Sequence, residues 1–280
     1  MQPTDFAPGE TMSTEVLDRG RDYRLLAEGR VDAERDRLTA LEALFDPTSR
    51  LARGLVQPGW RCLEVGGGHG SMARWLAEQV GPDGEVVATD IDARYLKELR
   101  IPNLRALQHD ILNDDLADLG QFDLVCSRLM LYWLRDGAQT AVDRMASLVR
   151  PGGWLVDEDG DWGSVVPIDP THPATGPHRA AYRDGGWFAD MGLDPWVGRK
   201  LSVMFERAGL EQISHTTTSE VIAGGSEWGE WWADSIEVVG AQSPGMSPDV
   251  VLTVCAPFRD PTARFMTALL HGCRGRRPTD

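Results

Sequence analysis

The stretch Leu63-Glu64-Val65-Gly66-Gly67-Gly68-His69-Gly70-Ser71 decides the fold of this chain. It begins as the end of a buried strand, continues as a glycine loop and leads into the first turn of a helix. Glycine is favoured where the backbone turns with a positive φ or comes within contact distance of a ligand. The first turn of a helix offers free N–H groups and the positive end of the helix dipole. The stretch therefore predicts a ligand-binding loop around which the rest of the chain is arranged.

Composition limits what this loop can bind. The chain has 280 residues, of which 42% are hydrophobic and 25% are charged, as in an ordinary globular protein. Its net charge of −15 disfavours nucleic acid as a partner, because phosphate binding needs a basic surface. The sequence has no apolar run long enough to span a membrane, and its first residues lack a signal-peptide pattern. We therefore expect a cytoplasmic protein that binds neither nucleic acid nor membrane.

Strand patterns alternate with helix patterns from Trp60 onward. Apolar runs predict strands at 61–65, 85–90, 104–109, 121–127 and 154–157, and apolar periodicity predicts helices at 71–80, 93–100 and 137–149. Such βαβ units form a doubly wound α/β sheet, which binds ligands at the carboxyl ends of its strands, near the point where strand order reverses. The strand at 61–65 and its glycine loop are predicted to lie at that point.

The flanking segments differ in character from this core. We predict four parts: an N-terminal arm and helical lid at 1–56, a ligand-binding core at 57–160, an insertion over the substrate site at 161–200, and a C-terminal part at 201–280 that completes the sheet. In the lid, a helix at 31–45 is expected to end at Asp46-Pro47. The last part is expected to contain a tryptophan-rich helix at 227–239, a helix at 248–255 and an edge strand at 265–270.

Two ligand classes compete for the glycine loop. A dinucleotide fingerprint has the pattern Gly-x-Gly-x-x-Gly, in which the third glycine lets the helix pack closely on the strand. Here the third position is Ser71, and the observed pattern is Glu64-x-Gly66-x-Gly68-x-Gly70. The spacing therefore disfavours a dinucleotide.

This pattern resembles motif I of the class I methyltransferases that use S-adenosylmethionine, and further pieces similar to that family follow in order. Asp90 closes the second predicted strand, and Asp110 follows the third. The runs Phe122–Arg128 and Leu148–Gly153 resemble the family's fourth motif and the turn before its fifth strand. The resemblance implies a Rossmann-like, mostly parallel sheet of seven strands with an antiparallel edge.

The same resemblance implies which residues hold S-adenosyl-L-methionine. Asp90 and its neighbour Ile91 would meet the ribose, and Asp110 and Ile111 would meet the adenine. The other expected cofactor-binding residues are Glu64, Gly66, Gly67, Gly68, Gly70, Ser127, Arg128 and, from the lid, Tyr23. Arg128 can pair with a carboxylate of the ligand; the alternative is a structural ion pair with Asp136 or Asp157.

The sequence assigns no catalytic residue. A sulfonium methyl group is already activated, so catalysis needs alignment and exclusion of water, and a base only where the acceptor is protonated. His172 and His178, in the insertion, are the candidate bases. The acidic residues at 157, 158, 159 and 161 are interpreted as a solvated loop, with a metal or a cationic amine as the alternative, and no metal is predicted.

Tryptophan is concentrated in the second half of the chain. We expect Tyr132, Trp133, Trp162 and Trp187 to line a substrate pocket, whereas Trp231 and Trp232 are interpreted as the core of their helix. The lid, the insertion and the tryptophan-rich cap are similar to those of small-molecule methyltransferases of bacterial secondary metabolism.

Three functions stay open at this point. The favoured one is methyl transfer to O, N or C of a small, largely apolar metabolite. The alternative is a methyltransferase fold that binds the cofactor but catalyses a cyclisation or pericyclic reaction. A non-enzymatic partner or a dinucleotide oxidoreductase is the third. We expect a monomer or a homodimer with a small-molecule substrate.

Overall fold

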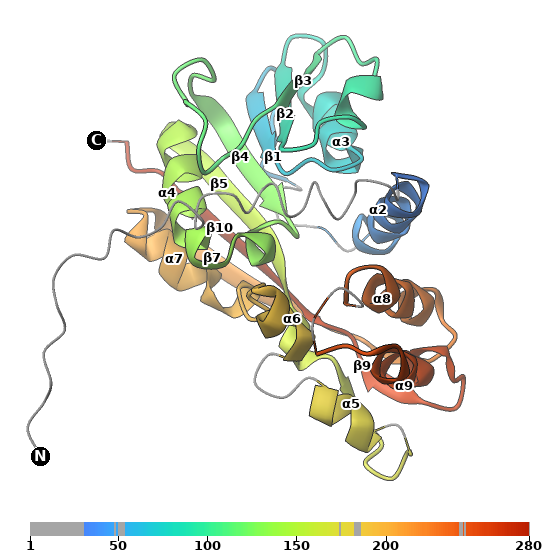
Figure 1. Ribbon diagram of the computed structural model, residues 1–280. Coiled ribbons are helices and arrows are strands. Elements are labelled where there is room, and N and C mark those ends of the chain that lie inside the picture. The colour runs from blue at the N-terminus through green and yellow to red at the C-terminus, as the bar shows by residue number, and fades with distance from the viewer. Residues whose placement is uncertain are drawn as a thin grey trace, which may run out of the picture.

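A seven-stranded sheet forms the centre of the computed structural model, which describes residues 31–47, 49, 54–173, 175–181, 186–240, 243 and 245–279 (Figure 1). The strand order is β3-β2-β1-β4-β5-β10-β7. The first five strands in this order are parallel, and β10 pairs antiparallel with both of its neighbours. The predicted Rossmann-like sheet, mostly parallel with antiparallel pairing at one edge, is confirmed.

The first four strands lie close to their predicted positions. β1 spans Arg61–Val65, β2 Glu85–Asp90, β3 Leu104–Gln108 and β4 Phe122–Arg128. Chain order reverses at β1, because the next strand, β2, lies on one side of it and β4 lies on the other. The glycine loop therefore leaves the sheet at the point where α/β sheets bind their ligands.

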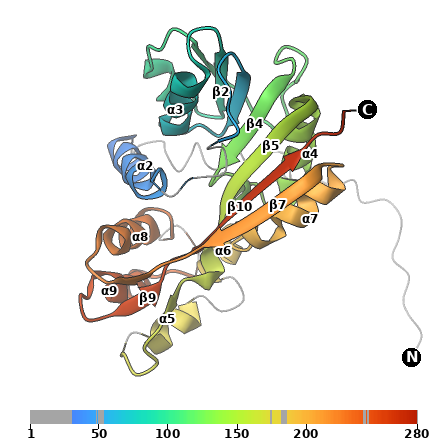
Figure 2. The same ribbon diagram turned by 180° about the vertical axis from the view of Figure 1, so that it is seen from behind.

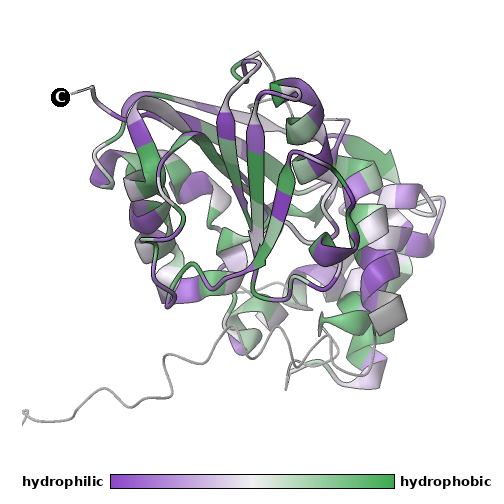
Figure 3. Cartoon of the chain, turned by 90° about the horizontal axis from the view of Figure 1, so that it is seen from above, coloured by the Kyte–Doolittle hydropathy of each residue, from purple (hydrophilic) through white to green (hydrophobic). Residues whose placement is uncertain are grey.

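Helices cover both faces of the sheet, which explains why the central strands β1, β2 and β4 are almost continuously buried. Successive residues of β1 point to opposite faces. Cys62 packs in one apolar core with α3 (Ser71–Val80), and Leu63 packs in the other core with α4 (Ala138–Leu148). α7 (Leu201–Arg207) lies beside α4 and covers β7 and β10 (Figures 1 and 2). Seen from above, apolar residues gather along the central strands (Figure 3).

Three predicted elements differ in the structure. β5 spans Val149–Asp161, much longer than the predicted strand at 154–157, because its second half pairs with β10 (Leu269–Arg276). The strand predicted at 265–270 is split: Phe265 belongs to β9 (Arg264–Met266), whereas β10 lies inside the main sheet, between β5 and the edge strand β7 (Glu211–Thr218). Of the helix predicted at 93–100, only the 3₁₀ turn η2 (Leu96–Glu98) forms.

A cap lies beyond the carboxyl end of β5. It contains a second sheet of order β6-β9-β8, with β6 at Val166–Pro167 and β8 at Val221–Ala223. Its helices are α5 (Thr175–Ala181), α6 (Gly186–Met191), α8 (Glu227–Val238) and α9 (Pro248–Arg259). α8 packs on α9 and on α2 (Val31–Phe45), so the predicted N-terminal helix joins the cap to the main sheet (Figure 1).

Three further 3₁₀ helices connect these parts: η3 (Leu131–Gly137) after β4, η4 (Trp162–Ser164) after β5 and η6 (Gly198–Lys200) before α7. None of the helices in the described ranges is both long and apolar enough to cross a membrane.

Two helical glycines test the close packing of the cap. A Cβ on Gly229 of α8 would lie 2.4 Å from the carbonyl oxygen of Phe258 in α9, whereas a Cβ on Gly176 of α5 would meet nothing within 4 Å. We expect Gly229→Ala to lower the free energy of unfolding by about 1–3 kcal/mol, because α9 must move away. Gly176→Ala should leave it unchanged or raise it by about 0.5 kcal/mol. Urea unfolding followed by circular dichroism measures both, and equal stability of the two variants would contradict the packing.

Candidate functional site

The glycine loop lies directly against the end of β2. The N–H groups of Gly66 and Gly67 donate to the carbonyl oxygen of Thr89, at N–O distances of 2.8 and 3.0 Å. Gly66 has a φ of 75°, and an added Cβ would lie 2.6 Å from Cγ of Met130. Only glycine satisfies both requirements, so the loop approaches its neighbours closely and has no side chain at Gly66, Gly67, Gly68 or Gly70.

Asp90, at the end of β2, faces this loop. Its Oδ2 accepts a hydrogen bond from the N–H of Gly68 at 2.8 Å, and its Oδ1 accepts one from the N–H of Asp92 at 2.9 Å. Burial raises the pKa of Asp90 to about 6. Asp92 is instead paired with Arg94 at 2.7 Å. Of the two acidic residues, Asp90 is therefore the one that lies at the loop.

Asp110 occupies the turn that follows β3. Its carboxylate accepts hydrogen bonds from the N–H of Leu112 and the side chain of Asn113, at 2.8 and 2.9 Å. The end of β3 is tied to the end of β2, because the N–H of His109 donates to the carbonyl of Asp90 at 2.9 Å. Ile111 is buried and Ile91 is half-buried. The turns that carry Asp90 and Asp110 are therefore neighbours at one edge of the sheet.

Glu64 is a buried carboxyl group just before the loop. Burial raises the pKa of Glu64 to about 8, although Arg128 opposes the shift. Among the residues that the structure describes, its Oε2 has no hydrogen-bond partner. An unpaired buried polar atom costs free energy, so Oε2 is available to a ligand.

Arg128, at the end of the adjacent strand β4, is a buried cation beside Glu64. Its Nη2 lies 2.7 Å from Asp46 and donates to the hydroxyl of Ser71 at 3.1 Å. Its Nη1 is buried and has no partner in the described part of the chain. Arg128 thus pairs with Asp46 of the lid, and the predicted alternatives, Asp136 and Asp157, are not its partners. Glu64 and Arg128 present one unpaired acceptor and one unpaired donor on neighbouring strands.

The side chain of Ser127 lies inside the sheet and forms a hydrogen bond there. Its hydroxyl donates to Oδ2 of Asp157 on β5, and both side chains are buried. Burial and the nearby Asp159 raise the pKa of Asp157 well above its usual range. Of the two predicted residues at the end of β4, Arg128 therefore lies at the glycine loop, and Ser127 supports the strand ends.

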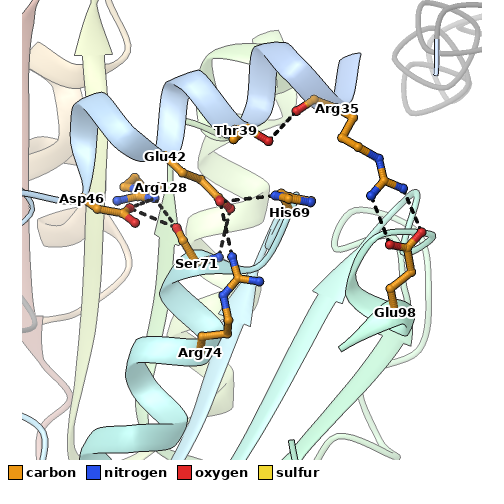
Figure 4. A network of polar contacts seen from close by, with 9 residues as sticks. All are labelled: Arg35, Thr39, Glu42, Asp46, His69, Ser71, Arg74, Glu98 and Arg128. Carbon is orange, nitrogen blue, oxygen red and sulfur yellow. Dashed lines mark hydrogen bonds and ion pairs between the residues drawn. The ribbon is translucent and has the colours of Figure 1, made fainter. Parts of the chain in front are cut away.

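α2 is held over the glycine loop by acidic side chains (Figure 4). Oε1 of Glu42 accepts a hydrogen bond from the N–H of Ser71 at 2.9 Å, and its Oε2 lies 3.4 Å from Nδ1 of His69. Arg35 pairs with Glu98 at 2.9 Å. Tyr23 lies outside the described residues.

The first turn of α3 was expected to offer its N–H groups to a ligand. The N–H of Ser71 instead donates its hydrogen bond to Glu42. Neither Glu42 nor Asp46 was predicted as a site residue. Their spacing of four residues, which places two carboxylates on one face of a helix, was the available signal.

The acidic run after Trp154 is not a solvated loop. Asp157, Glu158, Asp159 and Asp161 all belong to β5 and are buried. Asp159 accepts a hydrogen bond from the N–H of Leu131 at 2.8 Å and so positions the turn after β4, and Asp161 accepts one from Nε of Arg199 at 2.8 Å. The described residues contain no group of three metal-ligating side chains.

The candidate bases lie in the outer part of the cap. His172 is 3.2 Å from Oδ2 of Asp260. His178 is buried on α5, packs its ring on Phe258 at 5.3 Å, and has a pKa lowered by burial to about 4. α5 lies at the end of the molecule remote from α3 in both views (Figures 1 and 2). The structure does not bring either histidine to the glycine loop.

Tyr132, Trp162 and Trp187 belong to one cluster of aromatic rings at the ends of β4 and β5, and Trp133 packs on Tyr132 at its edge. The ring centroid of Tyr132 lies 4.9 Å from that of Trp133 and 5.6 Å from that of Trp162. Trp162 stacks on Trp232 at 5.0 Å, and Trp187 lies 6.4 Å from Trp232. We call the residues Phe45, Tyr132, Trp162, Trp187, Trp231 and Trp232 the aromatic cluster.

Comparison with known sequences gives a family and several partial relatives. A family described as "Methyltransferase domain" matches residues 32–215. Methyltransferase str3 of Strobilurus tenacellus is 36% identical over 137 residues, which are 47% of this chain and 47% of that protein. A ubiquinone/menaquinone biosynthesis C-methyltransferase of Ralstonia pickettii is 33% identical over 113 residues, which are 37% of this chain and 44% of that protein. The chain matches less than half the length of these curated relatives.

Solved structures share the fold at low identity. A cyclopropane-fatty-acyl-phospholipid synthase-like protein of Lactobacillus casei aligns with a TM-score of 0.50 at 17% identity, over 88% of this chain and 92% of that one. Phosphoethanolamine N-methyltransferase 2 of Haemonchus contortus, solved with phosphomonomethylethanolamine and S-adenosylhomocysteine, aligns with a TM-score of 0.50 at 15% identity, over 86% of this chain and 56% of that one. At these identities the likeness concerns the fold alone.

The contact between Asp46 and Arg128 gives a test of how the lid is held. The side chain of Arg128 is 8% exposed, so removing its carboxylate partner leaves a buried charge. We expect Asp46→Ala to lower the free energy of unfolding by about 1–3 kcal/mol and to increase hydrogen exchange in α2. Glu98→Ala removes the exposed ion pair with Arg35 of the same helix and should leave both the free energy of unfolding and the hydrogen exchange of α2 nearly unchanged. If the two variants have the same free energy of unfolding and the same hydrogen exchange in α2, Asp46 does not hold the lid.

Proposed function

This chain belongs to the methyltransferase family with the class I, Rossmann-like fold, and from this membership we propose that it transfers a methyl group from S-adenosyl-L-methionine to O, N or C of a small, largely apolar metabolite. The partial relatives named for ubiquinone and menaquinone biosynthesis support a small-molecule acceptor. The net charge of −15 favours such an acceptor over nucleic acid. We further propose bacterial secondary metabolism as the setting, on the strength of the tryptophan-rich cap.

The observation that carries this proposal is the pair of unpaired atoms beside the glycine loop. The methionine end of the cofactor has an ammonium group and a carboxylate. Nη1 of Arg128 is a donor for that carboxylate, and Oε2 of Glu64 is an acceptor for the ammonium group. Glu42 of α2 has its carboxylate at the start of α3, where it accepts the hydrogen bond from the N–H of Ser71. A dinucleotide would place its pyrophosphate there, and the carboxylate would repel that group.

The adenosine end fits the neighbouring turns. Asp90 would accept hydrogen bonds from the ribose hydroxyls, since its carboxylate lies at the loop and Ile91 follows it. Asp110 and Ile111, in the turn tied to Asp90, would meet the adenine. The close backbone at Gly66, Gly67, Gly68 and Gly70 leaves space between these two ends.

The residues of the chain would supply alignment and a dry site. S-adenosylmethionine, when bound, supplies a methyl group on a positively charged sulfur, which needs no further activation. Phe45 and the rest of the aromatic cluster would exclude water at the ends of β4 and β5. We propose no side chain as a catalytic base, because His172 and His178 lie away from the loop.

Calorimetry with S-adenosylhomocysteine tests the proposal. We expect binding by the full chain, and we expect Asp90→Ala to weaken it by about 1–3 kcal/mol, because the ligand hydroxyls would lose their acceptor. Asp92→Ala is the matched control, since Asp92 pairs with Arg94, and it should bind nearly as tightly as the parent chain. Absence of binding to the parent chain would overturn the proposed cofactor.

A labelled methyl group then tests the reaction itself. Transfer from radioactive S-adenosylmethionine to phenol, amine and polyketide acceptors is the expected result. Cofactor binding without transfer to any of them would favour a methyltransferase fold with a non-methylating reaction.

The raised pKa of Glu64 predicts how binding depends on pH. With a pKa of about 8, its carboxyl group is mostly protonated at pH 7 in the ligand-free protein, and an ammonium partner favours the ionised form. We therefore expect S-adenosylhomocysteine to bind more tightly as the pH rises from about 6 to 8, with release of protons that calorimetry in two buffers detects.

Glu64→Gln is the control for this prediction, because glutamine does not titrate. Its proton release should fall, and the pH dependence that remains should lie near the pKa of about 6 of Asp90. Equal proton release by the variant and the parent chain would show that Glu64 does not meet the ligand.

A further inference from the structure

Three buried tryptophans carry indole N–H groups that have no acceptor. Trp162 in η4, Trp187 in α6 and Trp231 in α8 are 2%, 3% and 5% exposed. None of the three Nε1 atoms has a hydrogen-bond partner within the described part of the chain. The indole N–H is only a donor, and a buried one normally finds an acceptor. Leaving it unpaired costs free energy, so three in one place call for an explanation.

All three donors belong to the aromatic cluster. Trp162 stacks on Trp232 with ring centroids 5.0 Å apart, and its centroid lies 6.1 Å from that of Trp231. The ring centroid of Trp187 lies 6.4 Å from that of Trp232. Ser235, one helical turn after Trp231, is also buried and has an unpartnered hydroxyl among the described residues. The three unpaired indole groups thus belong to one apolar cluster.

The cluster adjoins the proposed cofactor site. Phe45 and Asp46 are neighbours at the end of α2. The ring centroid of Phe45 lies 6.4 Å from that of Trp162 and 5.5 Å from that of Trp231. The carboxylate of Asp46 pairs with Arg128. Tyr132 reaches the cluster from the turn after β4, the strand that ends in Arg128. A molecule held among these rings would therefore lie beside the end of β4, next to the glycine loop.

The charge around the cluster limits what it can bind. Asp161 precedes Trp162, and Asp159 accepts a hydrogen bond from the N–H of Leu131, next to Tyr132. Both carboxyl groups are buried, and Asp161 is paired with Arg199, so Asp159 is the group that makes a negatively charged ligand unfavourable there. The three indole N–H groups are donors, so the ligand must bring acceptors. Oδ1 of Asp161, which has no hydrogen-bond partner among the described residues, is a buried acceptor next to Trp162 in the chain. A neutral molecule with carbonyl, ether or similar oxygens satisfies both conditions.

We propose that the aromatic cluster is the acceptor-substrate site and that it takes a flat, uncharged molecule whose oxygen atoms accept hydrogen bonds from Trp162, Trp187 and Trp231. This inference rests on the proposed function, and it names the class of substrate and the residues that select it. Phe45 of α2 closes one side of the cluster, so the ligand enters by displacing the lid helix.

Three naphthalene probes of similar shape test the proposal. 2-Acetylnaphthalene has a carbonyl acceptor, 2-ethylnaphthalene has none, and 2-naphthoate carries a negative charge. We expect the full chain to bind the ketone at least about fivefold more tightly than the hydrocarbon, the factor that a neutral hydrogen bond contributes. The naphthoate should bind more weakly than the ketone. In nuclear magnetic resonance spectra, the ketone should shift the indole N–H signals of the three tryptophans downfield.

Trp231→Phe separates hydrogen bonding from packing. This variant keeps an aromatic ring but lacks the N–H, so the preference for the ketone over the hydrocarbon should shrink, and by about as much as one hydrogen bond contributes. Trp154→Phe is the matched control: Trp154 lies near the middle of β5, beside Arg274 and Arg276 and eight residues before Trp162, and its change should leave the preference intact.

The outcomes are distinct from those of the cofactor test. Equal binding of ketone and hydrocarbon, binding of neither, or indole signals that do not move would overturn the substrate site, whatever the chain does with S-adenosylhomocysteine. Failure to bind S-adenosylhomocysteine, with the ketone still preferred, would instead overturn the proposed cofactor.

Discussion

The structure depends on a close approach of backbone at the glycine loop. Gly66 and Gly67 donate to the carbonyl of Thr89, and Gly68 donates to Asp90, so the loop lies against the end of β2 with nothing between them. A side chain at Gly66 would overlap Met130, which follows β4. Because Gly66, Gly67 and Gly68 carry no side chains, the ends of β1, β2 and β4 meet in one small region. The polar atoms at those ends then decide which ligand fits.

Charge selects among the ligands that such a loop accepts. In phosphate-binding folds the first turn of the helix is left open to an anion. Here Glu42 takes the N–H of Ser71, and the carboxyl groups of Glu64 and Asp90 lie close by. A phosphate would face like charge, whereas a group with both an ammonium and a carboxylate, as in the proposed cofactor, would meet Glu64 and Arg128. The same fold would then serve a different class of ligand through a few side chains.

Elements with a strong local signal could be predicted from the sequence, and elements formed by distant pairing could not. β1 to β4 are apolar runs, and α3 has clear periodicity, so their positions agree closely with prediction. The acidic second half of β5 has no strand pattern of its own, and it is extended because β10 pairs with it. Strand preference depends on neighbours more than on residue type, which is why the solvated-loop interpretation was wrong.

The sequence by itself determined the glycine loop, the acidic residue at the end of β2 and the alternation of strands and helices, because each depends on spacing and chemistry within a few residues. Only the tertiary structure decided that Asp46 meets Arg128, that Asp157 to Asp161 are buried, and that Trp162, Trp187 and Trp231 lie in one cluster. These contacts join segments far apart in the chain. Their free energy arises only when the folded chain brings the segments together, and no local pattern records it.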